Sequence, residues 1–146
     1  MKLVFFNEFK LGVVTGQDVV DISEVVKDIP RVGPGDLMSR LIENFDDYRA
    51  AIESAASSGK GVPLESVRLR APLPKPGKIL CMAGNYLENG TLTEPRPING
   101  FLKNRNAVIG DGDTVILPPA PVTIFHHEAE AGLVIGKKAS KVKAED

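Results

Sequence analysis

The sequence predicts an α+β fold, mainly β, in which a small N-terminal α+β unit precedes a β-rich segment. Short β-prone runs alternate with turn residues over residues 2–22, and an amphipathic helical pattern follows at residues 36–58. A proline-rich stretch at residues 71–77 then separates these elements from further β-prone runs. We therefore expect an N-terminal domain over residues 1–70, a linker, and a second part over residues 78–146.

The first strands are predicted by three short apolar runs, KLVFF, LGVVTG and DVVDIS. The pairs Asn7-Glu8 and Gly16-Gln17 lie between them and are typical of tight turns. A three-stranded meander is therefore expected over about residues 2–22.

One long helix is predicted next, because apolar side chains recur at helical spacing and form a single stripe. Asp36 is expected to cap the start of this helix, and Gly59 is expected to end it. We interpret the stripe as a packing face that covers the meander rather than as a ligand site. Its members are Leu37, Met38, Leu41, Ile42, Phe45, Tyr48 and Ile52.

The second part reads as strands separated by loops. KILCMAG is a continuous apolar run, which favours a strand buried on both sides. AVIGDGDTVILPP predicts two strands around a turn at residues 110–112, and FHHEAEAGLVIGKK predicts a last strand. The polar segment between residues 85 and 100 is expected to be a long loop.

Composition excludes several function classes. The chain carries 18 basic and 19 acidic residues, so it lacks the basic excess of a nucleic-acid-binding protein. No apolar run approaches the roughly 20 residues that span a bilayer, so no membrane partner is expected. Cys81 is the single cysteine and is expected to be buried and unreactive. A cytoplasmic protein is the simplest expectation.

Two glutamates precede the last apolar run. In a strand, residues i and i+2 share a face, so the carboxylates of Glu128 and Glu130 would converge on one small object. Paired like charges are unfavourable, and a hard divalent cation such as Mg²⁺ or Mn²⁺ would relieve the repulsion. The alternative is that both carboxylates face water on an edge strand while Ala129 and Ala131 face inward. The local pattern slightly favours this alternative.

Two histidines stand directly before the glutamates. By strand parity, His126 shares the face of Glu128 and Glu130, whereas His127 faces the opposite side. His126 is therefore a candidate ligand or general base. His127 is interpreted as a core residue.

Taken together, the motifs in the second half of the chain resemble those of the fumarylacetoacetate hydrolase family. The motifs that carry the resemblance are KILCMAGNY, INGFLKNRNAVIGDGDTVILP and IFHHEAEAGLVIGKKASKV, in the order and spacing of the family. Residues 1–70 also resemble the small N-terminal domain of many members. The resemblance implies the start of a β-rich catalytic domain at residues 78–146.

The resemblance implies a metal site and a reaction class. Glu128 and Glu130 match the E-x-E of the family, which supplies two ligands of a catalytic Mg²⁺, Mn²⁺ or Ca²⁺ ion. Family members cleave a C–C bond in small 2-oxo or β-diketo carboxylic acids by hydrolysis. Some relatives are lyases, decarboxylases or isomerases instead. The metal would act as a Lewis acid that stabilises the developing enolate. Asn85, Tyr86 and Lys103 match positions at the edge of the site and are expected to bind substrate.

Two departures from the family pattern matter. Many members carry a water-activating His and Glu where this chain has Asn89 and Leu92, and neither of these acts as a base at neutral pH. Glu88 and Glu94 lie on the same loop, and either is a candidate base. The family's third metal ligand, an aspartate, lies beyond the match to this chain.

This second departure predicts that the chain is a truncated piece. We expect it alone to bind metal weakly and to show little activity, whereas the complete protein is expected to be a homodimer. A non-catalytic subunit with the family fold is the alternative outside the enzymes.

Overall fold

The N-terminal strands form a meander in the computed structural model, which describes residues 1–87, 90–94 and 96–145. Strands β1 (Lys2–Phe6), β2 (Lys10–Thr15) and β3 (Asp18–Asp21) pair in antiparallel order, as predicted. The turns between them use left-handed backbone, with φ of 48° at Asn7 and 63° at Gly16. Asparagine and glycine adopt this conformation at the lowest steric cost, so the turn residues fix the register.

Two short strands complete this sheet. Strand β4 (Val62–Pro63) joins the β3 edge and strand β5 (Leu69–Arg70) joins the β1 edge, which gives the order β4-β3-β2-β1-β5. The alternating run at residues 67–71 thus becomes an edge strand of two residues. Its next residue, Ala71, is buried against the same unit.

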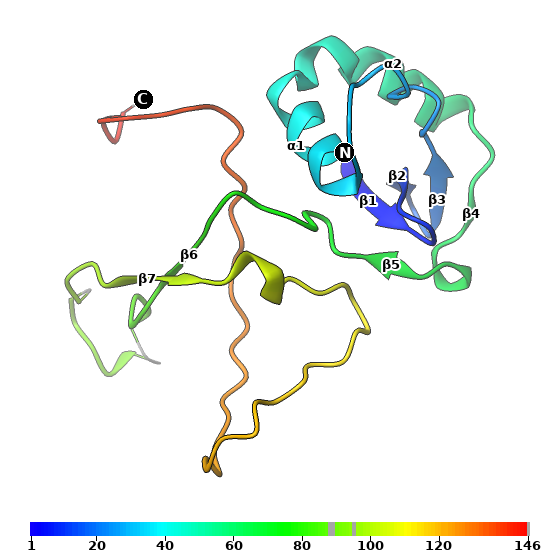
Figure 1. Ribbon diagram of the computed structural model, residues 1–146. Helices are drawn as coiled ribbons and strands as arrows, with labels where there is room; N and C mark the ends of the chain where they lie inside the picture. The colour runs from blue at the N-terminus through cyan, green and yellow to red at the C-terminus, as the bar shows by residue number, and fades with distance from the viewer. Residues whose placement is uncertain (88–89, 95, 146) are drawn as a thin grey trace.

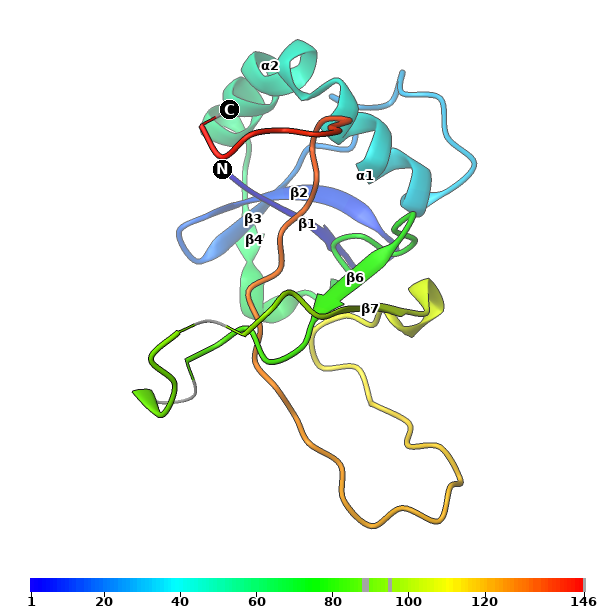
Figure 2. The same ribbon diagram turned by 90° about the vertical axis from the view of Figure 1, so that its left-hand side faces the viewer.

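Two helices cover one face of the sheet (Figures 1 and 2). Helix α1 spans Pro34–Glu43 and helix α2 spans Phe45–Ser58, so the single helix predicted over this region is wrong. The break falls at Asn44, whose side-chain amide donates to the Arg40 carbonyl at 2.9 Å. Asparagine commonly competes with the helical ladder in this way.

The start of α1 also differs from the prediction. Gly33 stands at the N-cap, and Pro34 begins the helix, where its missing N–H costs nothing. Asp36 is not the cap, because its carboxylate accepts a hydrogen bond from the Val32 amide at 3.0 Å instead. The predicted end at Gly59 is confirmed.

The hydrophobic core lies between the helices and the sheet. Phe5 and Leu11 from the sheet and Leu41 and Ile52 from the helices have no exposed surface, and they belong to one cluster. Burying each such side chain contributes about 1.5–3 kcal/mol. The predicted packing of the apolar helical stripe on the meander is therefore confirmed, and with it the α+β fold class.

The proline-rich stretch at residues 71–77 carries no helix or strand. Leu73 packs against the N-terminal core, and a Cβ on Gly35 would lie 2.8 Å from the Lys75 Cβ. The stretch therefore runs along the N-terminal unit, and the division of the chain at this point stays a prediction.

The second half contains a separate two-stranded ribbon. Strand β6 (Ile79–Met82) pairs antiparallel with β7 (Gly100–Lys103), and a 3₁₀ turn follows at Arg105–Ala107. The strand predicted from KILCMAG is confirmed, but its burial on both sides is not, because Leu80 is 66% exposed. Within the described part of the chain this sheet has two strands, which are too few to enclose a side chain on both faces.

Neither AVIGDGDTVILPP (residues 107–119) nor FHHEAEAGLVIGKK (residues 125–138) contains the strands predicted for it. An isolated strand leaves its N–H and C=O groups without partners, so it forms only beside another strand. Among the described residues, neither segment pairs with a strand. Many of their apolar side chains are consequently exposed, including Ile116 at 88% and Leu133 at 89%.

Among the described residues, we find no helix with both the length and the apolar character needed to cross a bilayer.

Truncating Leu41 tests the packing between helix and sheet. Leu41→Ala is expected to lower the free energy of unfolding by about 2–5 kcal/mol, because the side chain has no exposed surface and its loss leaves a cavity. Urea denaturation followed by circular dichroism measures the change. The matched control is Val32→Ala, since Val32 is 100% exposed and its loss should have little effect. Equal effects of the two substitutions would contradict the assigned core.

Candidate functional site

The two glutamates of the H-H-E-x-E motif lie on exposed chain. Glu128 and Glu130 are both exposed, and residues 119–145 contain no helix or strand. The strand geometry that would place the two carboxylates on one face is therefore not formed in this segment. His126 and His127 are exposed on the same segment, so the core position predicted for His127 is wrong.

The chemistry of the carboxylates fits a hard divalent ion, but their number falls short of a complete site. Such ions take six or more oxygen ligands, several of them from water or substrate. Among residues 1–87, 90–94 and 96–145, no three His, Cys, Asp or Glu side chains gather closely enough to hold a metal. Within the part of the chain that the structure describes, the E-x-E motif thus offers two candidate ligands.

The expected substrate-binding residues flank the β6–β7 ribbon. Asn85 and Tyr86 follow the end of β6, whereas Lys103 ends β7 opposite Ile79, the first residue of β6. A strand rises about 3.4 Å per residue, so the two groups lie at opposite ends of a ribbon about 10 Å long. The ribbon alone does not bring them together.

The local surroundings of these side chains are open. Lys103 is exposed, and its ammonium nitrogen lies 5.9 Å from the centre of the Phe101 ring. Among the described residues, no carboxylate forms an ion pair with Lys103. Tyr86 is 57% exposed.

The two candidate bases lie on the loop between β6 and β7. Glu94 is exposed there. Glu88 and the neighbouring departure from the family pattern, Asn89, lie outside the described residues. Leu92 is partly buried, and its amide donates to the Leu87 carbonyl at 3.3 Å. The described part of the loop therefore offers one carboxylate with free access to solvent.

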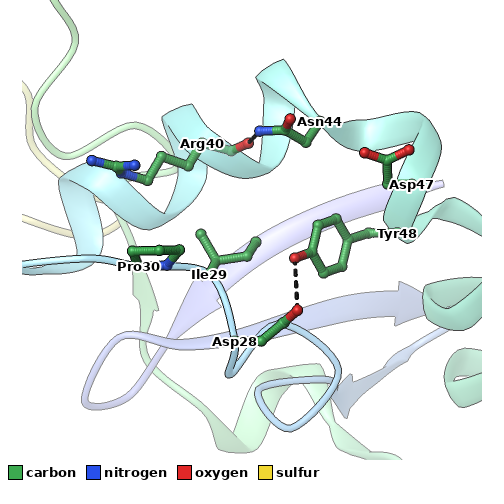
Figure 3. A pocket seen from close by; sticks show the side chains of 7 residues that line it. All are labelled: Asp28, Ile29, Pro30, Arg40, Asn44, Asp47 and Tyr48. Atoms are coloured by element: carbon green, nitrogen blue, oxygen red, sulfur yellow. Dashed lines mark hydrogen bonds between the residues drawn. The ribbon is translucent and has the colours of Figure 1, made fainter.

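A pocket of about 430 Å³ opens between α1, α2 and residues 28–30 (Figure 3). Within it, the Tyr48 hydroxyl donates to the Asp28 carboxylate at 3.0 Å. Partial removal from water, together with this carboxylate, raises the pKa of Tyr48. None of the residues expected to bind metal or substrate lines this pocket. The lining residues are Asp28, Ile29, Pro30, Arg40, Asn44, Asp47 and Tyr48.

One polar contact across the chain is absent from the sequence prediction. The Arg68 guanidinium donates to the Asp113 carboxylate at 2.6 Å, across 45 residues of sequence. This hydrogen bond, with a smaller contribution from the Gly110 amide, holds the pKa of Asp113 below its usual range. The sequence shows Arg68 on the polar face of an alternating run and Asp113 in a glycine turn, but no local signal pairs them.

Comparisons with known proteins support the resemblance. Residues 78–146 match the family model for the fumarylacetoacetate (FAA) hydrolase C-terminal domain. The maleylpyruvate hydrolase of Aquipseudomonas alcaligenes is 32% identical over 163 aligned positions, covering 99% of this chain and 56% of that protein. A mitochondrial oxaloacetate tautomerase of Rattus norvegicus is 34% identical, covering 90% of this chain and 41% of that protein.

A solved structure shares the fold. The maleylpyruvate hydrolase of Sphingobium sp. SYK-6, in complex with manganese(II) and pyruvate, matches with a TM-score of 0.70 and 36% identity. The match covers 83% of this chain and 44% of that one. The chain thus has the fold of a group of α+β proteins whose members include hydrolases and tautomerases. The chain belongs to the fumarylacetoacetate hydrolase family, and it spans about half the length of the curated relatives it matches.

Hydrogen exchange tests whether the segment around the glutamates is strand or irregular chain. Within the described residues 123–145, no backbone amide donates to another residue's carbonyl, so these amides should exchange at nearly the rate of free peptide. Amides of β6 and β7 should exchange more slowly. The measurement is exchange followed by mass spectrometry on the isolated chain. Protection of residues 126–132 would show that the predicted strand forms in solution.

Proposed function

We propose that this chain is part of a metal-dependent hydrolase that cleaves a C–C bond in a small 2-oxo or β-diketo carboxylic acid. The observation that carries the proposal is the similarity to two maleylpyruvate hydrolases, one of which was solved with manganese and pyruvate. Because the chain spans about half of such proteins, the activity is proposed for the complete protein.

Glu128 and Glu130 are the proposed metal ligands of this chain. Their ionised oxygens are the donors that Mg²⁺, Mn²⁺ and Ca²⁺ prefer, and the motif matches the E-x-E of the family. Neither carboxylate is engaged in an ion pair among the described residues, so both remain available for an ion.

The remaining roles concern substrate and protons. Lys103 would attract the carboxylate of the substrate, and Asn85 and Tyr86 would donate hydrogen bonds to its oxygens. Glu88, Glu94 or His126 would move the proton, with the loop between β6 and β7 closing over the site. The exposure of Glu94 leaves it available for such a closure.

A second candidate function is tautomerisation or decarboxylation of a related oxo acid. The oxaloacetate tautomerase relative of Rattus norvegicus favours it. The residues at the positions of the water-activating dyad, Asn89 and Leu92, favour it as well, because proton transfer between carbon and oxygen needs no activated water. A non-catalytic subunit with the same fold is the third candidate.

The complete protein is proposed to be a cytoplasmic homodimer. Its proposed partner is a small oxo-carboxylic acid, and neither nucleic acid nor membrane is proposed to bind.

Manganese titration tests the ligand assignment. The isolated chain should bind Mn²⁺ weakly, because it supplies two protein ligands, and Glu128→Gln or Glu130→Gln should weaken binding at least about tenfold. Electron paramagnetic resonance of free Mn²⁺ measures the change. Glu53→Gln on α2 is the control that removes one exposed carboxylate elsewhere. Tight binding by the isolated chain, or unchanged binding by the Glu128 and Glu130 variants, would contradict the assignment.

Substitution of the loop carboxylates tests the reaction. In the complete protein, Glu88→Gln or Glu94→Gln should slow C–C cleavage by about 10²–10⁴-fold if that residue is the base. Pyruvate release from maleylpyruvate and the ultraviolet change of oxaloacetate tautomerisation separate the two enzymatic candidates. Unchanged turnover in both variants would remove the loop carboxylates from the mechanism. A complete protein inactive in both assays would favour the non-catalytic subunit.

A further inference from the structure

Asp113 uses both of its carboxylate oxygens in hydrogen bonds at the turn formed by residues 110–113. Oδ2 accepts a hydrogen bond from the Gly110 amide at 2.8 Å, and the Asp113 amide returns one to the Gly110 carbonyl at 3.2 Å. Oδ1 accepts from Arg68 Nη2 at 2.6 Å. One carboxylate therefore closes its own turn and also joins that turn to the residue just before β5.

The backbone of the same turn lies directly on β5. A Cβ added to Gly110 would lie 3.0 Å from the Ala71 amide nitrogen and 3.1 Å from the Arg70 Cα. Both neighbours are backbone atoms, which cannot swing away. Figure 1 shows the yellow segment that follows β7 passing below β5. A side chain at this position would therefore push the turn and β5 apart by a few tenths of an ångström.

The β5 side of the contact is itself fixed by the β1–β2 turn. The Asn7 amide donates to the Arg68 carbonyl at 2.8 Å, and the Arg68 amide donates to Asn7 Oδ1 at 3.0 Å. Arg70 Nε donates to the Asn7 carbonyl at 2.5 Å. Both arginines are therefore oriented by a turn that belongs to the N-terminal sheet.

Among the described residues, these contacts attach the chain that carries the β6–β7 ribbon to the N-terminal unit on both sides of the ribbon. The linker at residues 71–77 is the covalent attachment, and the 110–113 turn is the second. The segment between them carries Asn85, Tyr86, Glu94 and Lys103. Opening of the second attachment would leave this segment freer to turn about the linker.

We infer that Arg68, Gly110 and Asp113 form a latch that fixes the orientation of the β6–β7 ribbon on the N-terminal sheet. Arg68 and Asp113 are positioning residues, because they act on the orientation of the ribbon and not on the substrate. The inference rests on the contacts and stands independently of the proposed chemistry. An exposed ion pair contributes little by itself, and Arg68 is 61% exposed, so the backbone contact at Gly110 and the ion pair act together.

The charges around Asp113 favour the closed latch at neutral pH. Arg68 and Arg70 both stabilise its ionised form, whereas Asp18, Glu65 and Asp111 line the adjoining groove. Because the pKa of Asp113 is lowered from 3.8, its stabilising contribution is present above that value and is lost as the pH falls through the lowered pKa.

A distance measurement between two spin labels tests the latch. The labels sit on Lys60→Cys in the N-terminal unit and Asn99→Cys beside the ribbon, in a Cys81→Ser background. The doubly labelled chain with Arg68, Gly110 and Asp113 unchanged should give one narrow distance distribution at pH 7. Arg68→Gln, Asp113→Asn and Gly110→Ala should each broaden it at least about twofold. The double variant Arg68→Gln/Asp113→Asn should be no broader than either single variant, because both remove the same contact.

Two controls separate loss of the latch from loss of folding. Lys10→Gln removes the exposed Lys10–Asp21 ion pair of the sheet, at 3.2 Å, and should leave the distribution narrow. Arg68→Lys keeps the charge and should retain most of the narrow component. Circular dichroism verifies the helices in every variant. Narrow distributions in the Arg68 and Asp113 variants, a broad one with the latch intact, or equal broadening by Lys10→Gln would overturn the inference.

Discussion

The apolar contact between the five-stranded sheet and helices α1 and α2 is the interaction on which the rest of the structure depends. Phe5, Leu11, Leu41 and Ile52 are removed from water there, and strands β4 and β5 are too short to persist without that support. The linker packs on the same unit through Leu73. The N-terminal unit is therefore the frame on which the second half of the chain is oriented.

Local patterns account for the elements that the sequence predicts well. Short apolar runs separated by turn residues at Asn7 and Gly16 define a meander whose strands are neighbours in sequence, so no distant partner has to be known. The helical stripe is equally local. The sequence does not predict the break at Asn44, because apolar periodicity continues through it. In the structure, the Asn44 side-chain amide donates to the Arg40 carbonyl where the first helix ends.

Distant pairing accounts for most of what the sequence does not predict. The apolar runs within residues 107–119 and 125–138 are typical of strands, but such a run does not say which backbone would pair with it. Strand β6 has a partner in β7, across the intervening loop. The same limit applies to the site. The H-H-E-x-E motif indicates Glu128 and Glu130 as candidate metal ligands, whereas the candidate bases Glu88 and Glu94 lie in a loop far away in sequence. The Arg68–Asp113 pair lies beyond local patterns for the same reason.

The apolar side chains displayed by the second half govern how this chain behaves in water. Ile116 and Leu133, which are almost fully accessible, represent a surface that water hydrates unfavourably. Attraction between such surfaces grows on warming from low temperature and fades on cooling. Dilution and cold should therefore keep chains apart, while concentration and warmth should drive them into assemblies held by hydration entropy rather than by charge.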